Sequence, residues 1–144
     1  MFKMYWGSYV PEADSAAEAI RLGIEHAADA LELANLTRPG PFGLRTIELG
    51  EYFGIFEGSR LVAMAGERMH ADKFREISGV CTHPDFQGRG FARKLMFKLI
   101  QRQIQRGEIP FLNVMCENTN AHRLYERMGF QTYVESIIRV VSKQ

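Results

Sequence analysis

The order of elements in the second half of the chain restricts the fold to a few topologies. Apolar and β-branched residues alternate with helical stripes that end at glycine. The pattern predicts a strand over Phe74–Thr82, a helix from Phe91 to Gly107, a strand over Phe111–Cys116, a helix over Thr119–Met128 and a strand over Phe130–Val141. This order requires at least one parallel strand pair joined by a right-handed crossover.

The first half of the chain predicts antiparallel structure. Tyr52–Phe56 and Leu61–Met69 are strand patterns separated by a short hairpin connection. The aromatic segment Phe2–Val10 fits a first strand, and Ala16–Leu36 has apolar residues near helical spacing. Leu44–Leu49 fits either a short helix or an irregular passage.

These elements together predict the fold class. A chain of 144 residues, 46% hydrophobic and 24% charged, has the length and composition of one globular domain spanning residues 1–144. We expect an α+β fold with α/β/α layers, built on a mixed, mostly antiparallel sheet with helices on both faces. No secretory leader and no membrane-length apolar run is readable, so we expect a soluble cytoplasmic protein without membrane contact.

Cysteine and histidine usage predicts neither a disulfide framework nor a metal centre. The two cysteines, Cys81 and Cys116, are too few for a disulfide scaffold, and no Cys/His spacing fits a zinc site. In a reducing compartment both are expected to be buried thiols.

The net charge of +1 conceals a division between the two halves of the chain. Residues 1–86 carry 8 basic and 13 acidic side chains, whereas residues 87–144 carry 10 basic and 4 acidic ones. A basic half indicates an anionic partner. A nucleic acid is not expected, because Phe91, Phe97 and Phe111 occupy core positions rather than an exposed stacking surface.

The loop Gln87-Gly88-Arg89-Gly90-Phe91-Ala92 lies between a predicted strand and the strongest predicted helix. Its glycines permit a tight turn with inward N–H groups, and the helix start adds unpaired N–H groups and a positive dipole end. This arrangement predicts a phosphate or pyrophosphate site, although a plain Gly-rich turn would have the same glycines. No P-loop string occurs, and Arg93 replaces the third glycine of a dinucleotide fingerprint.

Two ordered motifs resemble the GNAT superfamily of acyl-CoA-dependent N-acetyltransferases. Gln87, Gly90 and Ala92 match its Gln/Arg-x-x-Gly-x-Gly/Ala motif at a strand-to-helix junction. The segment from Asn118 to Phe130 is similar to its Asn-x-x-Ala-x-x-Leu-Tyr-x-x-x-Gly-Phe. The similarity covers about residues 61–130, so residues 1–45 are assigned by position alone.

The resemblance implies acetyl-CoA as co-substrate, held by the loop and by a splayed central strand. The backbone that would cradle the CoA pyrophosphate belongs to Gln87, Gly88, Arg89, Gly90, Phe91 and Ala92. The pantetheine arm would pair with backbone groups of Val80, Cys81 and Thr82 and contact Asn118. Gly79 fits the bulge that such a strand requires, and Arg89, Arg93 and Lys94 could add positive charge. Asn118 also fits an ordinary helix N-cap.

Acetyl transfer to an amine requires a base, an oxyanion donor and an acid for the departing thiolate. Tyr125 matches the family tyrosine that protonates the thiolate, although its spacing also fits a core aromatic. Glu76 is the predicted base and Glu67 an alternative, while a backbone N–H near Val80 is the expected oxyanion donor. An acyl-enzyme route through Cys81 is disfavoured, because no activating base adjoins it in sequence.

The leading interpretation is an N-acetyltransferase that transfers acetyl from acetyl-CoA directly to a primary amine in a ternary complex. The alternative is a non-catalytic acyl-CoA-binding module with a GNAT-like fold. The acceptor is a small-molecule or peptide amine whose identity the motifs do not specify. Glu48, Glu51 and Glu67 are candidates for attracting a cationic amine, and an exposed final strand would permit a homodimer.

Overall fold

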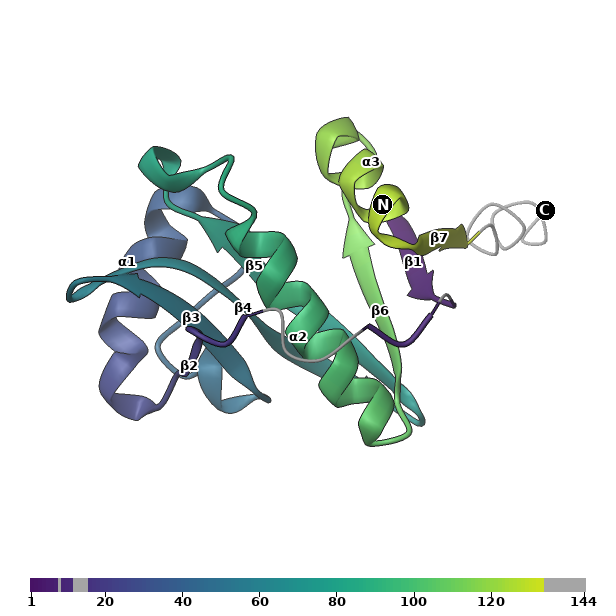
Figure 1. The fold of residues 1–144 in the computed structure, drawn as a ribbon, viewed down its shortest axis with the longest axis horizontal. Coiled ribbons are helices and arrows are strands. Elements are labelled where there is room, and N and C mark those ends of the chain that lie inside the picture. Colours follow the sequence, from purple (N-terminus) through teal and green to yellow (C-terminus); the bar gives the residue numbers. More distant parts are fainter. Residues whose placement is uncertain (8, 12–15, 134–144) are drawn as a thin grey trace.

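The computed structural model describes residues 1–7, 9–11 and 16–133, and Figure 1 shows their arrangement. These residues form one sheet of order β2-β3-β4-β5-β6-β1-β7. The strands are β1 Phe2–Trp6, β2 Ile20–Arg21, β3 Tyr52–Glu57, β4 Arg60–Ala71, β5 Phe74–Thr82, β6 Ile109–Val114 and β7 Phe130–Tyr133. The helices are α1 Ala27–Thr37, α2 Phe91–Gln105 and α3 Thr119–Met128, with 3-10 turns η1 Ile24–His26, η2 Thr46–Glu48 and η3 Pro84–Phe86.

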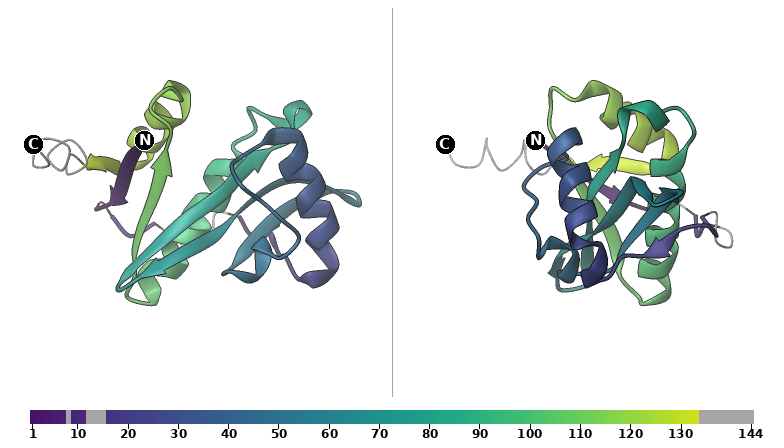
Figure 2. Two further views of the ribbon diagram at one scale, coloured as in Figure 1. Left: turned by 180° about the vertical axis from the view of Figure 1, so that it is seen from behind. Right: turned by 90° about the vertical axis from the view of Figure 1, so that its left-hand side faces the viewer.

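The sheet is mixed, as the order of elements predicts. Strands β5 and β6 run parallel, with α2 as their crossover, and the other paired strands run antiparallel. Helices α1 and α2 lie on opposite faces of the sheet, which Figure 2 shows from behind and from the side. The predicted α+β class with a parallel pair in a mostly antiparallel sheet is therefore confirmed.

The parallel pair separates after three registered positions. Pairing runs from Phe74 opposite Ile109 to Glu76 opposite Phe111 and ends there. Beyond this point the two strands diverge, and Figure 2 shows them as the arms of a V. The predicted splay is therefore present, and it opens a gap between β5 and β6 inside the sheet.

A β-bulge lies at the place where β5 leaves β6. The β4–β5 register steps from Cys81 opposite Met64 to Ser78 opposite Gly66, which leaves one extra residue on β5. Gly79, in this step, has φ +66°, and a Cβ there would lie 3.0 Å from the buried ring of Tyr52. Only glycine fits this backbone and this contact without strain. The bulge predicted at Gly79 is confirmed, and it bends β5 away from β6.

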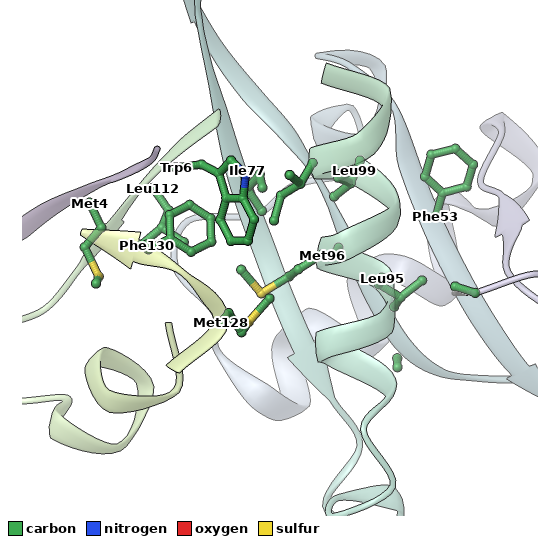
Figure 3. Close-up of a cluster of buried hydrophobic side chains, with 14 of the residues drawn as sticks. Met4, Trp6, Phe53, Ile77, Leu95, Met96, Leu99, Leu112, Met128 and Phe130 are labelled. Carbon is green, nitrogen blue, oxygen red and sulfur yellow. The ribbon is translucent and has the colours of Figure 1, made fainter. Parts of the chain in front are cut away.

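Two apolar clusters fix the layers. The larger cluster lies under α2 and includes Met96, Leu99, Ile77, Trp6 and Phe130. Figure 3 shows the Met96 and Met128 side chains meeting beside the Trp6 ring. The smaller cluster lies under α1 and is built around Leu33, Tyr52 and Met64. Because apolar clusters cover both faces of the sheet, the sheet is open at the gap between β5 and β6.

The predicted helix over Ala16–Leu36 is wrong in its first half. Ile20–Arg21 pairs with β3 as an edge strand, Gly23 precedes a 3-10 turn, and α1 begins only at Ala27. Ile24 is 79% exposed, so the apolar spacing of this segment does not mark a buried helix face. Glycine destabilises a helix interior, and pairing with β3 gives this segment backbone hydrogen bonds. Both effects favour the strand over the helix.

Other boundaries differ by a few residues. The first strand ends at Trp6 rather than Val10, and the undecided segment Leu44–Leu49 contains the 3-10 turn η2. The final strand is described as far as Tyr133, and the rest of the predicted span to Val141 lies outside the described residues.

The N-terminal strand lies in the C-terminal part of the sheet. Strand β1 sits between β6 and β7 and is antiparallel to both, with Phe2 opposite Val114 and Trp6 opposite Phe130. The Trp6 ring packs edge-on against Phe130, which in turn contacts the ring of Tyr125. The first residues of the chain therefore support the strand that anchors α3.

Candidate functional site

A cavity of about 220 Å³ occupies the gap where β5 and β6 diverge, and we call it the splay cavity. Three strands, α3, the N-terminus and the loop after α1 contribute to its wall. The lining residues are Met1, Pro39, Gly40, Pro41, Arg68, Glu76, Ile77, Ser78, Gly79, Val80, Leu112, Asn113, Met115 and Tyr125. Of the residues predicted from sequence, Glu76, Val80 and Tyr125 are brought together here.

An ion pair between the partly exposed Arg68 and the buried Glu76 lines the splay cavity. Arg68 Nε donates to Glu76 Oε1 and Arg68 Nη2 to Glu76 Oε2, each at 2.8 Å. Asn113 Nδ2, from the opposite strand β6, donates to Glu76 Oε2 at 2.8 Å. The hydrogen bond to Glu76 raises the pKa of Arg68, so the guanidinium stays charged. Side chains thus bridge β5 and β6 where backbone pairing stops.

Tyr125 contributes a phenol to the wall from α3. Its ring packs edge-on against Phe130 at 6.2 Å between centroids. Burial raises the pKa of Tyr125, because the phenolate would lose its hydration. The hydroxyl is therefore protonated at neutral pH, as a proton donor must be.

The backbone of β5 offers hydrogen-bonding groups to the gap. His83 N–H donates to Val62 at 2.7 Å, and antiparallel pairs alternate between bonded and non-bonded residues. Thr82 lies opposite Ala63, and Cys81 lies opposite Met64. The N–H and C=O groups of Thr82 and Val80 therefore point away from β4, whereas those of Cys81 point toward β4. Within the predicted trio, Val80 and Thr82 thus face the gap.

The thiol of Cys81 lies in the cluster under α1, away from the lining of the splay cavity. Burial raises the pKa of Cys81 to about 11, so the nucleophilic thiolate is scarce at neutral pH. Cys116, which we expected to be buried, is exposed, and its sulfur accepts a hydrogen bond from the Met1 amine at 2.8 Å. That expectation is wrong, because Cys116 lies beyond the end of β6.

This difference predicts selective labelling of the two thiols. At pH 7.5, a maleimide is expected to modify Cys116 of the folded chain quickly and Cys81 only after unfolding, because Cys81 is both buried and protonated. Intact mass and peptide mapping would measure the order of modification. Cys116→Ser should abolish the fast phase, and fast labelling of Cys81 would contradict the assignment.

The Gly-rich loop begins α2 without a capping side chain. Gly90 is the N-cap with φ +76°, Gly88 has φ +82°, and no side-chain hydrogen bond caps the helix. The first turn also contains no acidic residue. Uncapped N–H groups and the positive dipole end together make this helix start an anion-binding geometry.

Basic side chains surround the same helix start. Arg89 stacks on Phe86 at 4.9 Å and Arg93 on Phe97 at 5.3 Å, while Lys94 pairs with Glu18 at 3.5 Å. Cations in the first turn of a helix oppose its dipole unless an anion binds there. The loop and these side chains lie after the C-terminal end of β5, outside the residues that line the splay cavity.

Asn118 is the N-cap of α3. Its side chain accepts a hydrogen bond from the Ala121 N–H at 3.2 Å. Asn118 therefore caps the helix, as one of its two interpretations predicted, and its contact with a pantetheine arm stays a prediction.

The acidic residues considered for the amine lie away from the splay cavity. Glu67 is 1% exposed and accepts hydrogen bonds from Arg106 and from Gln103, the latter at 3.0 Å. Glu51 binds Arg102 at 2.5 Å and Arg106 at 2.8 Å. Adjacent strand residues point to opposite faces, so Arg68 reaches the cavity and Glu67 does not. Neither Glu67 nor Glu51 is placed to act on an acceptor there.

Sequence reasoning missed several wall residues. Arg68 and Asn113 bind Glu76, and Ser78 and the loop Pro39–Pro41 complete the lining. The one available signal was the hairpin between β4 and β5, whose register brings Arg68 close to Glu76. That register shifts between Glu67 and His70, the interval that contains Arg68, so counting from the turn would have placed Met69 rather than Arg68 opposite Glu76.

Within the described residues, no helix has both the length and the apolar character needed to cross a bilayer. The same residues contain no group of three His, Cys, Asp or Glu side chains arranged to hold a metal ion.

Comparisons with known proteins agree with this geometry. The sequence profile described as FR47-like protein matches residues 52–140. A GNAT-family protein of Novosphingobium aromaticivorans has a crystal structure with TM-score 0.86 and 39% identity, over 92% of this chain and 59% of that one. N-alpha-acetyltransferase RimI of Mycobacterium tuberculosis is 35% identical over 83 residues, 56% of this chain and 51% of that protein.

A more distant structure shares the fold. AAC(6')-Iy, in complex with the bisubstrate analogue CoA-S-monomethyl-acetylneamine, has TM-score 0.63 and 17% identity over 78% of this chain and 89% of that one. The chain spans about half the length of the Mycobacterium relative and 59% of the Novosphingobium protein. The profile match over residues 52–140 and the similarity to the Novosphingobium structure show that the chain belongs to the FR47-like family within the GNAT superfamily of acetyltransferases.

Proposed function

We propose that the protein transfers the acetyl group of acetyl-CoA to a primary amine by direct attack in a ternary complex. The observation that carries the proposal is the splay cavity, whose wall holds the protonated Tyr125 on one side and the Glu76 carboxylate on another. A proton donor and a proton acceptor on separate walls of one cavity are what this transfer requires.

The residues around α2 fit the phosphates of CoA. The start of α2 has no capping side chain and no acid in its first turn, but it has Arg93 and Lys94. A pyrophosphate bound by the N–H groups of Gly88 through Ala92 would satisfy those donors. Its negative charge would also compensate Arg93 and Lys94, whose positive charges oppose the helix dipole. The gap-facing backbone of Val80 and Thr82 would then pair with the pantetheine arm, which points the thioester toward the cavity.

Each step of the transfer has a residue of this chain beside it. The free amine attacks the thioester carbon, and the oxygen that becomes negative accepts a hydrogen bond from an N–H of β5 near Val80. As the new N–C bond forms, the C–S bond breaks and Tyr125 gives its proton to the departing sulfur. The proton lost by the amine passes to Glu76, directly or through a water, and water restores the Tyr125 proton.

The relatives support the choice of donor and acceptor chemistry. One is named an N-alpha-acetyltransferase, which acts on amines, and AAC(6')-Iy is solved with an analogue that joins CoA to its substrate. A single bisubstrate molecule implies that both substrates occupy that protein together. Cys81, buried and protonated, offers no route through an acyl-enzyme here.

The test combines binding with turnover. Acetyl-CoA is expected to raise the melting temperature, and free thiol should appear only when a suitable amine is added. Stabilisation without turnover across a broad amine panel would favour a binding module instead. No stabilisation at millimolar acetyl-CoA would overturn both interpretations.

A matched pair of glycine variants locates the cofactor site. Gly90 and Gly107 both have positive φ and open space where a Cβ would lie, and they flank the two ends of α2. Leucine at either position is expected to cost about 1–2 kcal/mol of folding stability. Only Gly90→Leu should also weaken acetyl-CoA binding, by about tenfold or more, because it blocks charge-assisted N–H bonds to phosphate. Equal acetyl-CoA affinities for the two variants, by calorimetry, would count against this site.

A further inference from the structure

The lining of the splay cavity comes from both faces of the sheet. Ile77 and Leu112 belong to the apolar cluster under α2, and Tyr125 packs against that cluster. Their strand neighbours Glu76 and Asn113 point to the opposite face, because successive side chains alternate along a strand. That face is the one on which α1 lies, as Figure 2 shows. The cavity therefore has an α2 side and an α1 side.

The two sides separate the acetyl donor from the acceptor. The proposed phosphate site lies at the start of α2, and Tyr125, the proposed acid for the CoA thiolate, lies on the α2 side. Glu76, the proposed proton acceptor for the amine, lies on the α1 side. An amine that reaches Glu76 without crossing the cofactor must therefore enter from the α1 side. The residues that line this entrance are the ones that select the acceptor.

The α1 side of the cavity has an apolar rim. Pro39, Gly40 and Pro41 follow the end of α1 and line the cavity, and Met115 lines it from the end of β6. Met115 stands two residues beyond Asn113, so it lies on the same side. Its side chain is 49% exposed, which leaves a large apolar group in water beside the cavity. A carbon chain bound on this rim would remove apolar surface of both partners from water.

The charged groups on the lining favour an acceptor with a single positive charge. Among the described residues of the lining, Glu76 carries the one carboxylate, and Arg68 and Asn113 already donate three hydrogen bonds to it. Of about four acceptor positions on a carboxylate, one on Oε1 is left for an amine. The Arg68 guanidinium and the Met1 ammonium bring two positive charges against that one negative charge. A polycationic acceptor would therefore be repelled.

The volume of the cavity limits which part of the acceptor enters it. At about 220 Å³, the cavity is smaller than the roughly 300–1,000 Å³ of pockets that enclose a whole drug-sized ligand. The cavity must also hold the thioester carbon. The amine and the carbon beside it therefore fit inside, while the rest of the acceptor lies on the rim.

We propose that the acceptor is a primary amine with one positive charge and an apolar substituent, which lies between the Pro39–Pro41 loop and Met115. This inference rests on the proposed acetyltransferase function and names its substrate class. The amine nitrogen takes the acetyl group, its displaced proton passes to Glu76, and CoA leaves as the thiol. A small apolar amine and the N-terminus of a peptide with an apolar first residue share this chemistry.

The test measures thiol release from acetyl-CoA with a series of amino-acid amides, whose amines differ in the substituent. Leucinamide is expected to have a kcat/KM about 10- to 100-fold above that of glycinamide, the range for burying a leucine side chain. Norleucinamide and lysinamide have side chains of similar length, and lysinamide should be at least about tenfold slower because it adds a second charge. Equal or faster turnover of glycinamide, lysinamide or spermidine would overturn the proposal.

A tripeptide amide that begins with leucine distinguishes the two sources of such an amine. A kcat/KM above that of leucinamide would support the proposal with peptide N-termini as the source. A kcat/KM below it would support the proposal with small-molecule amines as the source.

Met115→Gln tests the rim while retaining the length of the side chain. It is expected to lower kcat/KM for leucinamide by about tenfold and to leave glycinamide turnover and the KM for acetyl-CoA unchanged. Met69→Gln is the matched control, because Met69 is 52% exposed and lies outside the lining, and it should change none of these quantities. An equal loss for both amides, or a raised KM for acetyl-CoA alone, would contradict the role of Met115 as an acceptor contact.

Failure of this inference is distinguishable from failure of the acetyltransferase function. Turnover of glycinamide, lysinamide or spermidine at or above the rate of leucinamide would leave the function standing and remove the apolar acceptor. If no amine turns over, calorimetry on the acetyl-CoA complex decides, and tighter binding of leucinamide than of glycinamide supports the rim. Equal binding of the two amides overturns it.

Discussion

Tyr125→Phe is expected to lower turnover by about 10²- to 10⁴-fold, the range for loss of a general acid. The substitution removes only the hydroxyl, and the ring can keep its edge-on contact with Phe130. Without a donor beside it, the sulfur must leave as an unprotonated thiolate. Acetyl-CoA affinity should change by less than about threefold, because the hydroxyl acts on a charge that develops only in the transition state. Stopped-flow thiol detection and calorimetry would measure the two quantities.

The pH dependence gives this prediction a second readout. Burial raises the pKa of Tyr125 above its ordinary value near 10, so the acid stays protonated through neutral and mildly alkaline solution. Turnover of the wild type should therefore show no loss of an acid below about pH 10. Tyr9→Phe, which removes an exposed hydroxyl, is the control and should leave turnover unchanged. Unchanged turnover in Tyr125→Phe would remove Tyr125 from the acid role.

Glu67→Gln is expected to destabilise the fold by about 3 kcal/mol, within the range for breaking a buried ion pair on one side. The carboxylate accepts from the Glu51 N–H at 2.9 Å, from Gln103 and from Arg106. The amide replaces one accepting oxygen by a donor, which would face other donors in a buried site. It also leaves the charge on Arg106 with less compensation. Urea unfolding would measure the loss, which corresponds to roughly 10 °C in melting temperature.

The control for this variant is Glu48→Gln. Glu48 pairs with Arg45 on the surface, where the two side chains are 43% and 88% exposed. Exposed pairs contribute about 0–1 kcal/mol, so the same chemical change should be nearly neutral there. Equal unfolding free energies for the two variants would show that the Glu67 network contributes little to stability.

This network also explains part of the charge division along the sequence. Glu51 and Glu67, from the acidic half, bind Arg102 and Arg106 from the basic half. Some of the positive charge after residue 87 is therefore used to hold α2 against the sheet. Near the start of α2, Arg89 lies 3.6 Å from Glu57 and Lys94 lies 3.5 Å from Glu18, while Arg93 stacks on Phe97. We propose that these basic side chains meet the phosphates of CoA.

Elements that depend on local chemistry could be predicted from the order of residues. The strand Phe74–Thr82 and the helix Thr119–Met128 agree with the prediction at both ends, because periodicity and terminating residues define them. Gly79 was readable as a bulge and Gly90 as a helix start, since both positions need a backbone that glycine adopts freely. The motif around Tyr125 pointed to a residue that lines the splay cavity, and its role as the acid stays a prediction.

Which side chains meet, in contrast, depends on the folded sheet. Strand β1 lies between β6 and β7, far from its sequence neighbours, because pairing partners are chosen by the whole sheet. Ile20–Arg21 became an edge strand because β3 was there to pair with it. The Arg68–Glu76–Asn113 cluster joins three strands across a register shift and a splay. A shift of one residue turns a strand's side chains to the other face, so this cluster could not be predicted from spacing along the chain.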